Sequence, residues 1–167
     1  MSFELKIERR FDASPEAVFD AFADRTAQGV LHGAERKGWN VEVIQTDVRV
    51  GGTSIVRMGP EGQEPDTETR EYSVVDRPHR LELRYSMHVA EWGRAIDTDL
   101  TVTFEDRDGG TLLTMVETGF DREEDRDAFM TGWPEFLDTL GAIATSYGPG
   151  GVDQPGTDGV MKARHDT

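Results

Sequence analysis

The acidic residue best placed for proton chemistry is Glu117, near the end of the segment Thr111–Thr118. Side chains alternate between the two faces of a strand, so Glu117 shares a face with Thr111, Leu113 and Met115. Burial of that face would raise the pKa of the Glu117 carboxyl and make it a proton donor or a general base. Pairing with an inward Arg or Tyr, or exposure at the strand end, stays open as an alternative.

Metal binding is not expected from the histidines and carboxylates. His88-x-x-Glu91 lies near Asp97 and Asp99, but alternation places His88 on the outer face of its strand, and no second histidine is near in sequence. The motif Asp106-x-Asp108-Gly109 lacks the other ligand positions of a calcium loop, and its Asp-Gly pair is typical of a hairpin turn. We predict no metal site.

Motifs of covalent and phosphoryl-transfer catalysis are absent from the sequence. Gly51-Gly52 is not followed by Lys-Ser/Thr, no Gly-x-Ser-x-Gly occurs, and the chain has no Cys. His32 and His79 lie in glycine- and proline-rich connections, where we expect surface positions. The sequence therefore indicates no catalytic residue beyond the weak candidate Glu117, and no cofactor.

Charge restricts the partners of the protein. Its 18 basic and 33 acidic residues give a net charge of −15, a field that repels nucleic acid and anionic lipid surfaces. The first ten residues carry five charges, so they contain no apolar stretch for a signal peptide or a membrane span. We expect a cytoplasmic protein that binds neither nucleic acid nor membrane.

Most of the chain has the two-residue periodicity of strands. The clearest case places Leu81, Leu83, Tyr85 and Met87 on one face and charged or polar residues on the other. Alternation of this kind predicts seven strands, within the segments 3–11, 41–43, 54–58, 72–75, 81–88, 96–104 and 111–118.

Helices are predicted at both ends of the strand-rich region. Ser14 is a good cap and Pro15 suits the first helical position, so a short helix follows the first strand. Residues 24–40 are ambiguous, with a helical turn over 27–31. Two further helical pieces are predicted, over 122–131 and 134–147, interrupted at Pro134 because an interior proline costs about 3 kcal/mol.

The length of 167 residues argues for one domain, which we place at residues 1–147. Residues 148–167 are rich in Gly, Pro and Asp and too poor in apolar side chains to offset the entropy of ordering, so we expect a flexible tail there. The order of elements predicts an α+β fold, a curved antiparallel sheet of six or seven strands wrapped around a long C-terminal helix.

Several motifs together resemble the START-like superfamily, also called SRPBCC or helix-grip, and within it the bacterial homologues of the heat-shock ATPase activator C-terminal domain. The resemblance covers roughly residues 3–146. It rests on Ser14-Pro15-Glu16-Ala17-Val18-Phe19, Asp47-x-Arg49-x-Gly51-Gly52, Asp76-Arg77-Pro78-His79-Arg80-Leu81, Gly109-Gly110-Thr111 and Gly132-Trp133-Pro134-x-x-Leu137.

The resemblance implies an apolar cavity between the sheet and the C-terminal helix, no obligatory cofactor and, for most bacterial members, no defined substrate. The family often has His-Ser before Gly-Phe on the last strand, where this chain has Glu117-Thr118. Eukaryotic activators carry a further N-terminal chaperone-binding domain. No such segment precedes Met1, so we do not expect a direct chaperone role.

We therefore expect a protein that binds a small apolar or amphipathic ligand rather than an enzyme. Two other hypotheses stay open: a cyclase- or aromatase-type enzyme that uses Glu117, and a chaperone or regulatory interaction module. The sequence permits a homodimer without requiring one. The expected ligand-binding residues are Val56, Met58, Tyr72, Tyr85, Met87, Phe104, Met115, Glu117, Trp133, Phe136 and Leu137.

Overall fold

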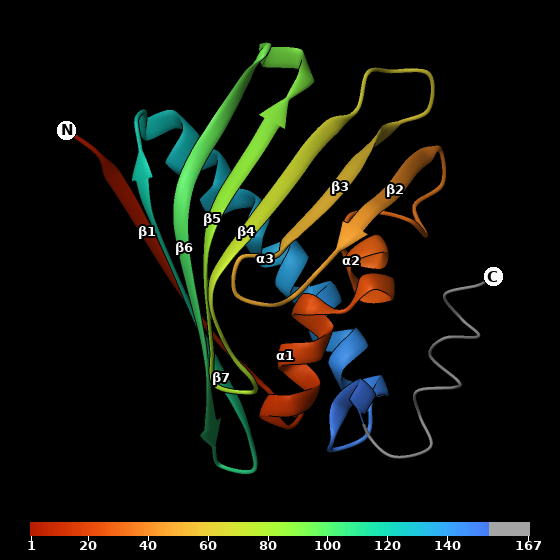
Figure 1. The fold of residues 1–167 in the computed structure, drawn as a ribbon, viewed down its shortest axis with the longest axis vertical. Coiled ribbons are helices and arrows are strands. Elements are labelled where there is room, and N and C mark those ends of the chain that lie inside the picture. Colours follow the sequence, from red (N-terminus) through yellow and green to blue (C-terminus); the bar gives the residue numbers. More distant parts are fainter. Residues whose placement is uncertain (154–167) are drawn as a thin grey trace.

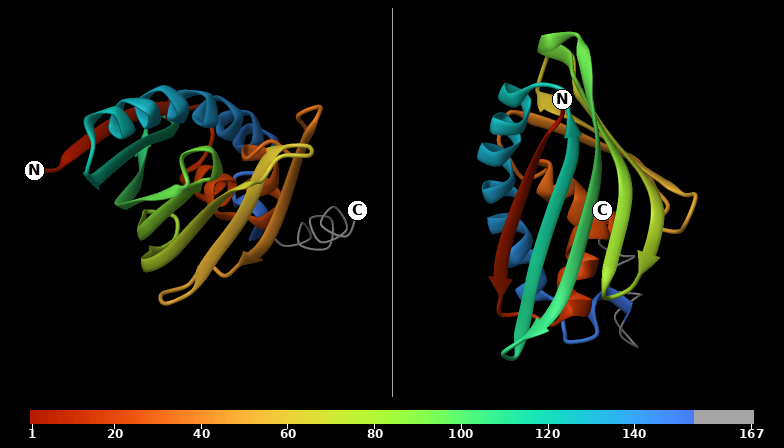
Figure 2. Two further views of the ribbon diagram at one scale, coloured as in Figure 1. Left: turned by 90° about the horizontal axis from the view of Figure 1, so that it is seen from above. Right: turned by 90° about the vertical axis from the view of Figure 1, so that its left-hand side faces the viewer.

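Seven antiparallel strands form one curved sheet, and three helices lie on its concave side (Figure 1, Figure 2). The computed structural model describes residues 1–153. The spatial order of the strands is β1-β7-β6-β5-β4-β3-β2. Their bounds are β1 Phe3–Phe11, β2 Trp39–Thr46, β3 Thr53–Pro60, β4 Asp66–Asp76, β5 Arg80–Val89, β6 Arg94–Arg107 and β7 Gly110–Phe120.

The predicted α+β helix-grip architecture is confirmed, and side-chain alternation accounts for most of it. On β5, Leu81, Leu83 and Tyr85 are buried, as the odd positions were expected to be. The least accurate prediction concerns β4, which begins at Asp66 instead of Tyr72. Its first half carries charged residues, whose polarity conceals a strand with one buried face.

Two short helices follow β1. The helix α1 covers Pro15–Ala23, with Pro15 at its start and the Ser14 hydroxyl accepting from the Ala17 amide at 3.1 Å. Asp24 ends α1 and caps α2, Arg25–Leu31, by accepting from the Thr26 and Ala27 amides. The ambiguous region 24–40 therefore contains one further short helix.

The helix α3 covers Glu123–Ser146 without a break, so the predicted interruption at Pro134 is wrong. Proline removes one amide donor from the helix, but apolar side chains anchor the helix to the sheet on both sides of it, among them Trp133, Leu137 and Leu140. Near its start, Asp125 accepts two hydrogen bonds from the Arg94 guanidinium at 2.8 and 2.9 Å. Tertiary packing here outweighs the local cost of proline.

The core lies between the sheet and the helices. Phe104 of β6 contacts Phe19 and Phe22 of α1, with ring centroids 5.2 and 6.4 Å apart. Burial of each such side chain contributes roughly 1.5–3 kcal/mol. This packing fills the end of the concave side nearest α1 and leaves open the part under the first half of α3.

The segment after α3 contacts α1. Gly151–Asp153 form a short 3₁₀ turn, and the Val152 amide donates to the Asp20 carboxylate at 2.9 Å. The Arg77 guanidinium joins the Asp20 carboxylate to the Gly150 carbonyl. Residues 148–153 of the expected tail are thus held against the domain, and residues 154–167 lie outside the described residues. Within residues 1–153, none of the helices combines the length and the apolar composition of a membrane span.

Candidate functional site

A cavity of about 290 Å³ lies between the sheet and the first half of α3. The C-terminal end of α2 and strands β4 and β5 form one wall, and one side of α3 forms the other. The helix α3 lies across the concave side of the sheet (Figure 2), and the cavity between the two layers is open to solvent. The lining residues are His32, Glu68, Tyr85, Met87, Ala128, Phe129, Gly132, Trp133 and Phe136.

Aromatic side chains form the helical wall. Trp133 lies edge-to-face with Phe136, at 5.0 Å between ring centroids, and also contacts Phe129 at 6.3 Å. The Tyr85 ring of β5 contacts Trp133 at 5.9 Å from the other side. These tilted and T-shaped contacts fix the rings and give the cavity an apolar surface.

The polar groups of the cavity gather around Glu68. Its side chain points inward together with that of Arg70, two positions along β4, and the register pairs Arg70 with Tyr85. The Glu68 carboxylate accepts hydrogen bonds from Arg70 Nε at 2.8 Å, Tyr85 Oη at 2.9 Å and His32 Nε2 at 2.9 Å. All but His32 are almost fully buried, and the His32 side chain is only 7 % exposed. We call these four residues the Glu68 cluster.

Hydrogen-bond geometry shows which nitrogen of His32 carries a proton. His32 Nδ1 lies 2.7 Å from the Gln28 carbonyl oxygen, which only accepts, so Nδ1 carries a proton. Its Nε2 faces a carboxylate that already accepts from Arg70 and Tyr85. Both ring nitrogens donate when His32 is an imidazolium, which gives the cluster two cations and one anion.

The surroundings of Glu68 hold it ionised. Burial alone raises the pKa of the carboxyl, but the charges of Arg70 and His32 and the donated hydrogen bonds outweigh burial, so the pKa of Glu68 falls well below its usual range. Burial and the nearby carboxylates Glu68 and Glu117 raise the pKa of Tyr85 well above 10. Tyr85 is therefore a neutral phenol at physiological pH.

Glu117 is a second buried carboxyl, held apart from the Glu68 cluster. It accepts from Thr98 Oγ1 at 2.6 Å and from Trp133 Nε1 at 2.9 Å. Burial raises its pKa to about 7, although the two hydrogen bonds lower it and the charge of Glu68 raises it further. The expected inward orientation is confirmed, but the partners are a threonine and a tryptophan instead of an Arg or Tyr, and Glu117 is not among the lining residues.

The predicted ligand-binding residues divide into two groups. Tyr85, Met87, Trp133 and Phe136 line the cavity. The others are buried but do not line it: Val56, Met58, Tyr72, Phe104, Met115, Glu117 and Leu137.

Sequence reasoning missed the Glu68 cluster. The expected surface position of His32 is wrong, because its ring packs against Phe136 at 6.0 Å and bonds to Glu68. Glu68 and Arg70 lie outside the predicted strand. Their signal was the spacing Glu68-x-Arg70-x-Tyr72, which puts opposite charges and an aromatic ring on one face of a strand.

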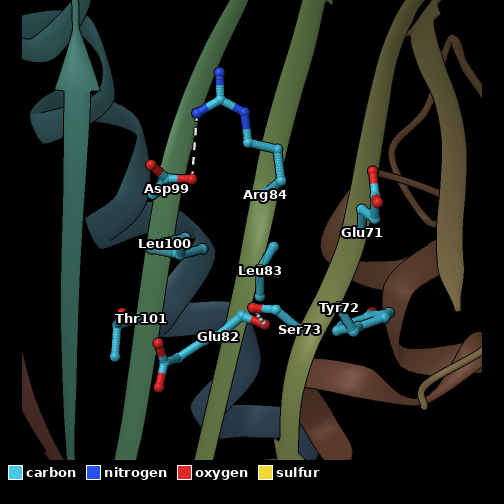
Figure 3. A pocket seen from close by; sticks show the side chains of 9 residues that line it. All are labelled: Glu71, Tyr72, Ser73, Glu82, Leu83, Arg84, Asp99, Leu100 and Thr101. Atoms are coloured by element: carbon cyan, nitrogen blue, oxygen red, sulfur yellow. Dashed lines mark hydrogen bonds and ion pairs between the residues drawn. The ribbon is translucent and has the colours of Figure 1, made fainter. Parts of the chain in front are cut away.

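Two other depressions flank this region. A groove of about 490 Å³ between α2 and α3 shares His32, Gly132 and Phe136 with the cavity. The outer face of the sheet carries a depression of about 350 Å³ over β4, β5 and β6 (Figure 3). Its charged side chains are solvated, and Arg84 pairs with Asp99 at 3.2 Å, so this surface is much more polar than the cavity beside α3. In the part of the chain that is described, no three His, Asp or Glu side chains gather to hold a metal.

Comparison with known proteins places this fold in a family. The family model described as "Activator of Hsp90 ATPase homolog 1-like protein" matches residues 12–145. No curated protein matches the chain.

Solved bacterial structures share the fold. A protein from Rhizobium loti is 25 % identical, with a TM-score of 0.71 over 86 % of this chain and 97 % of that one. A protein from Chromobacterium violaceum is 24 % identical, with a TM-score of 0.70 over 84 % and 96 %. An AHSA1-like protein from Aeromonas hydrophila is 22 % identical, with a TM-score of 0.65 over 86 % and 93 %.

Proposed function

The chain belongs to the family of activator of Hsp90 ATPase homolog 1-like proteins, and on that basis we propose that it binds a small apolar or amphipathic molecule between the sheet and α3. The observation that carries this proposal is the cavity of about 290 Å³, whose walls are mainly aromatic and Met side chains. A concave, mostly apolar space with a few converging polar groups is typical of small-molecule sites.

Gly132 supports the same function. It lies inside α3, exposed at the edge of the cavity, and a Cβ built there would meet no atom within 4 Å apart from its chain neighbours and the adjacent backbone of its own helix. Glycine in a helix interior costs roughly 1 kcal/mol relative to alanine, and close packing does not require it here. The missing side chain leaves the space beside His32 and Phe136 open, which suits entry of a ligand.

Catalysis by Glu117 has weaker support. Its pKa of about 7 suits proton transfer. However, both carboxylate oxygens are hydrogen-bonded within the protein, and Glu117 does not line the cavity. An interaction module has no stronger basis, since the exposed large apolar side chains of the described region belong to different elements and connections: Met1, Ile44, Val50, Trp92 and Met130.

The proposal is tested by closing the cavity. Naphthalene serves as an apolar probe, and its affinity is measured by fluorescence titration. Gly132→Leu places a side chain over the cavity and should weaken binding at least about tenfold, while the better helix former stabilises the fold by up to about 1 kcal/mol. Stability and binding therefore move in opposite directions, which separates a blocked site from a damaged protein.

Thr131→Leu is the matched control. Thr131 is the exposed neighbour in the same helix and does not line the cavity, so binding should be unchanged. Failure of naphthalene to bind the unmodified protein, or equal binding by Gly132→Leu, would contradict the proposed function.

A further inference from the structure

We infer that the ligand of this cavity is a neutral molecule with an apolar body and one hydroxyl or N–H group, which donates a hydrogen bond to the oxygen of Tyr85 or to one of Glu68. The inference rests on the proposed function and specifies the chemistry of its ligand. Three features carry it: the donors of the lining side chains are already used, acceptor positions remain free, and Arg70 and His32 already neutralise the Glu68 carboxylate.

Side-chain donors among the lining residues are all engaged. His32 uses Nδ1 on the Gln28 carbonyl and Nε2 on Glu68. Tyr85 gives its hydroxyl proton to Glu68, and Trp133 gives its indole proton to Glu117. A ligand group that only accepts hydrogen bonds would therefore find no side-chain donor along the wall.

Acceptor capacity remains on the same wall. A phenolic oxygen can accept as well as donate, and no group within residues 1–153 donates to the Tyr85 hydroxyl oxygen. The two oxygens of the Glu68 carboxylate offer about four acceptor positions, of which three are used. A ligand hydroxyl or N–H placed there would make a hydrogen bond that an ether or a hydrocarbon cannot make.

The cavity suits neither a cation nor an anion. A cation would approach Glu68, but the charges of Arg70 and His32 already offset that carboxylate. The excess positive charge of Arg70 and His32 would attract an anion, but the anion would lose its hydration and find no free donor among the lining side chains. Arg70 Nη2 lacks an acceptor among the described residues, but Arg70 does not line the cavity.

The inference is tested with four probes that share one aromatic body: 2-naphthol, 2-methoxynaphthalene, 2-naphthoate and 2-naphthylmethylammonium. Dissociation constants are measured on the full chain at pH 7 by calorimetry. 2-Naphthol should bind about tenfold more tightly than its methyl ether, the effect of one buried hydrogen bond, and more tightly than either ion.

Tyr85→Phe removes the phenolic acceptor, keeps the ring and frees a further acceptor position on Glu68. A preference for 2-naphthol over the ether that falls to about threefold or less assigns the ligand's hydrogen bond to Tyr85, and a preference that survives assigns it to Glu68. Tyr72→Phe is the matched control. Tyr72 is equally buried, its hydroxyl bonds to Ser54 at 2.9 Å, and it does not line this cavity. The preference should survive in this variant.

Each contrary outcome has a distinct meaning. Equal binding of 2-naphthol and its ether to the unmodified protein overturns the inference and leaves the proposed function standing. Tightest binding by 2-naphthoate also overturns it and indicates that an anion reaches Arg70. If no member of the series binds, the proposed function itself fails. The comparison of 2-naphthol with its methyl ether in the unmodified protein tests the inference even if Tyr85→Phe does not fold.

Discussion

Replacement of Glu117 by Gln should change how the stability of the protein depends on pH. The folded protein raises the pKa of this carboxyl from 4.5 to about 7. Between these values the folded state holds a proton that the unfolded state has released, so the free energy of unfolding falls as pH rises. The contribution is fully present below pH 4.5 and is lost above pH 7.

The size of the effect follows from the two pKa values. A change from 4.5 to about 7 corresponds to roughly 3 kcal/mol in total, as an upper bound. About 2 kcal/mol of this falls between pH 5.5 and 8.5, a range that avoids precipitation near the isoelectric point of 4.6. Glu68 titrates well below this range and Tyr85 well above it.

The glutamine of the Glu117→Gln variant would keep the hydrogen bonds without the titration. Its amide oxygen can accept from Trp133 Nε1, and its amide nitrogen can donate to the Thr98 hydroxyl, which replaces the two bonds seen with Glu117. Urea unfolding, followed by circular dichroism at several pH values, measures both proteins. At each pH, the free energy of unfolding of one protein is subtracted from that of the other, so that the contributions of all other carboxyls cancel.

The Glu117→Gln variant should gain about 2 kcal/mol relative to the unmodified protein between pH 5.5 and 8.5. Glu71→Gln is the control, since this residue is exposed on β4. A plot of its free energy of unfolding against pH should run parallel to that of the unmodified protein. If the plot for Glu117→Gln also runs parallel to that of the unmodified protein, burial does not raise the pKa of the Glu117 carboxyl, and the prediction is refuted.

Three further predictions concern the cluster, the long helix and the C-terminal segment. Glu68→Gln should lower the free energy of unfolding by about 3 kcal/mol or more, because Arg70 keeps a buried charge without its anion. Urea unfolding measures this loss, and a loss below about 1 kcal/mol would contradict a buried ion pair of Glu68 and Arg70. The ionised Glu68 also means that the unmodified protein loses this stabilisation as pH falls below 4.5. Pro134→Ala should raise the thermal midpoint by adding an amide donor inside α3, and an unchanged or lower midpoint would show that proline is favoured there. Asp20→Asn should speed hydrogen exchange at the Val152 amide, whereas unchanged exchange would mean that the segment is held by other contacts.

The strands were predictable where burial follows hydrophobicity. On β7 the buried positions Thr111, Leu113, Met115 and Glu117 share one face, and the alternation alone predicted it. Predictions from local helix propensity failed where tertiary packing outweighs that propensity. Pro134 stays inside α3 because residues on both sides pack on the sheet, which no helix propensity records.

The candidate site was only half predictable. Tyr85, Met87, Trp133 and Phe136 are apolar or aromatic, and their periodicity places them toward the sheet–helix gap. The Glu68 cluster was invisible because a charged side chain in a strand usually faces water, and its inward position depends on partners from β5 and α2. These contacts form only when α2 packs together with β4 and β5, which are distant from it in the sequence.

The pairing of β1 with β7 has a consequence for how the protein folds during its synthesis. Every other neighbouring pair in the sheet is also consecutive along the chain, whereas Phe3 pairs with Phe120. On the ribosome, the first strand made would therefore wait with an unpaired backbone edge until the last strand emerges. Closure of this long loop should set the pace of folding, and any delay in translation before β7 would prolong the interval in which the nascent chain can aggregate.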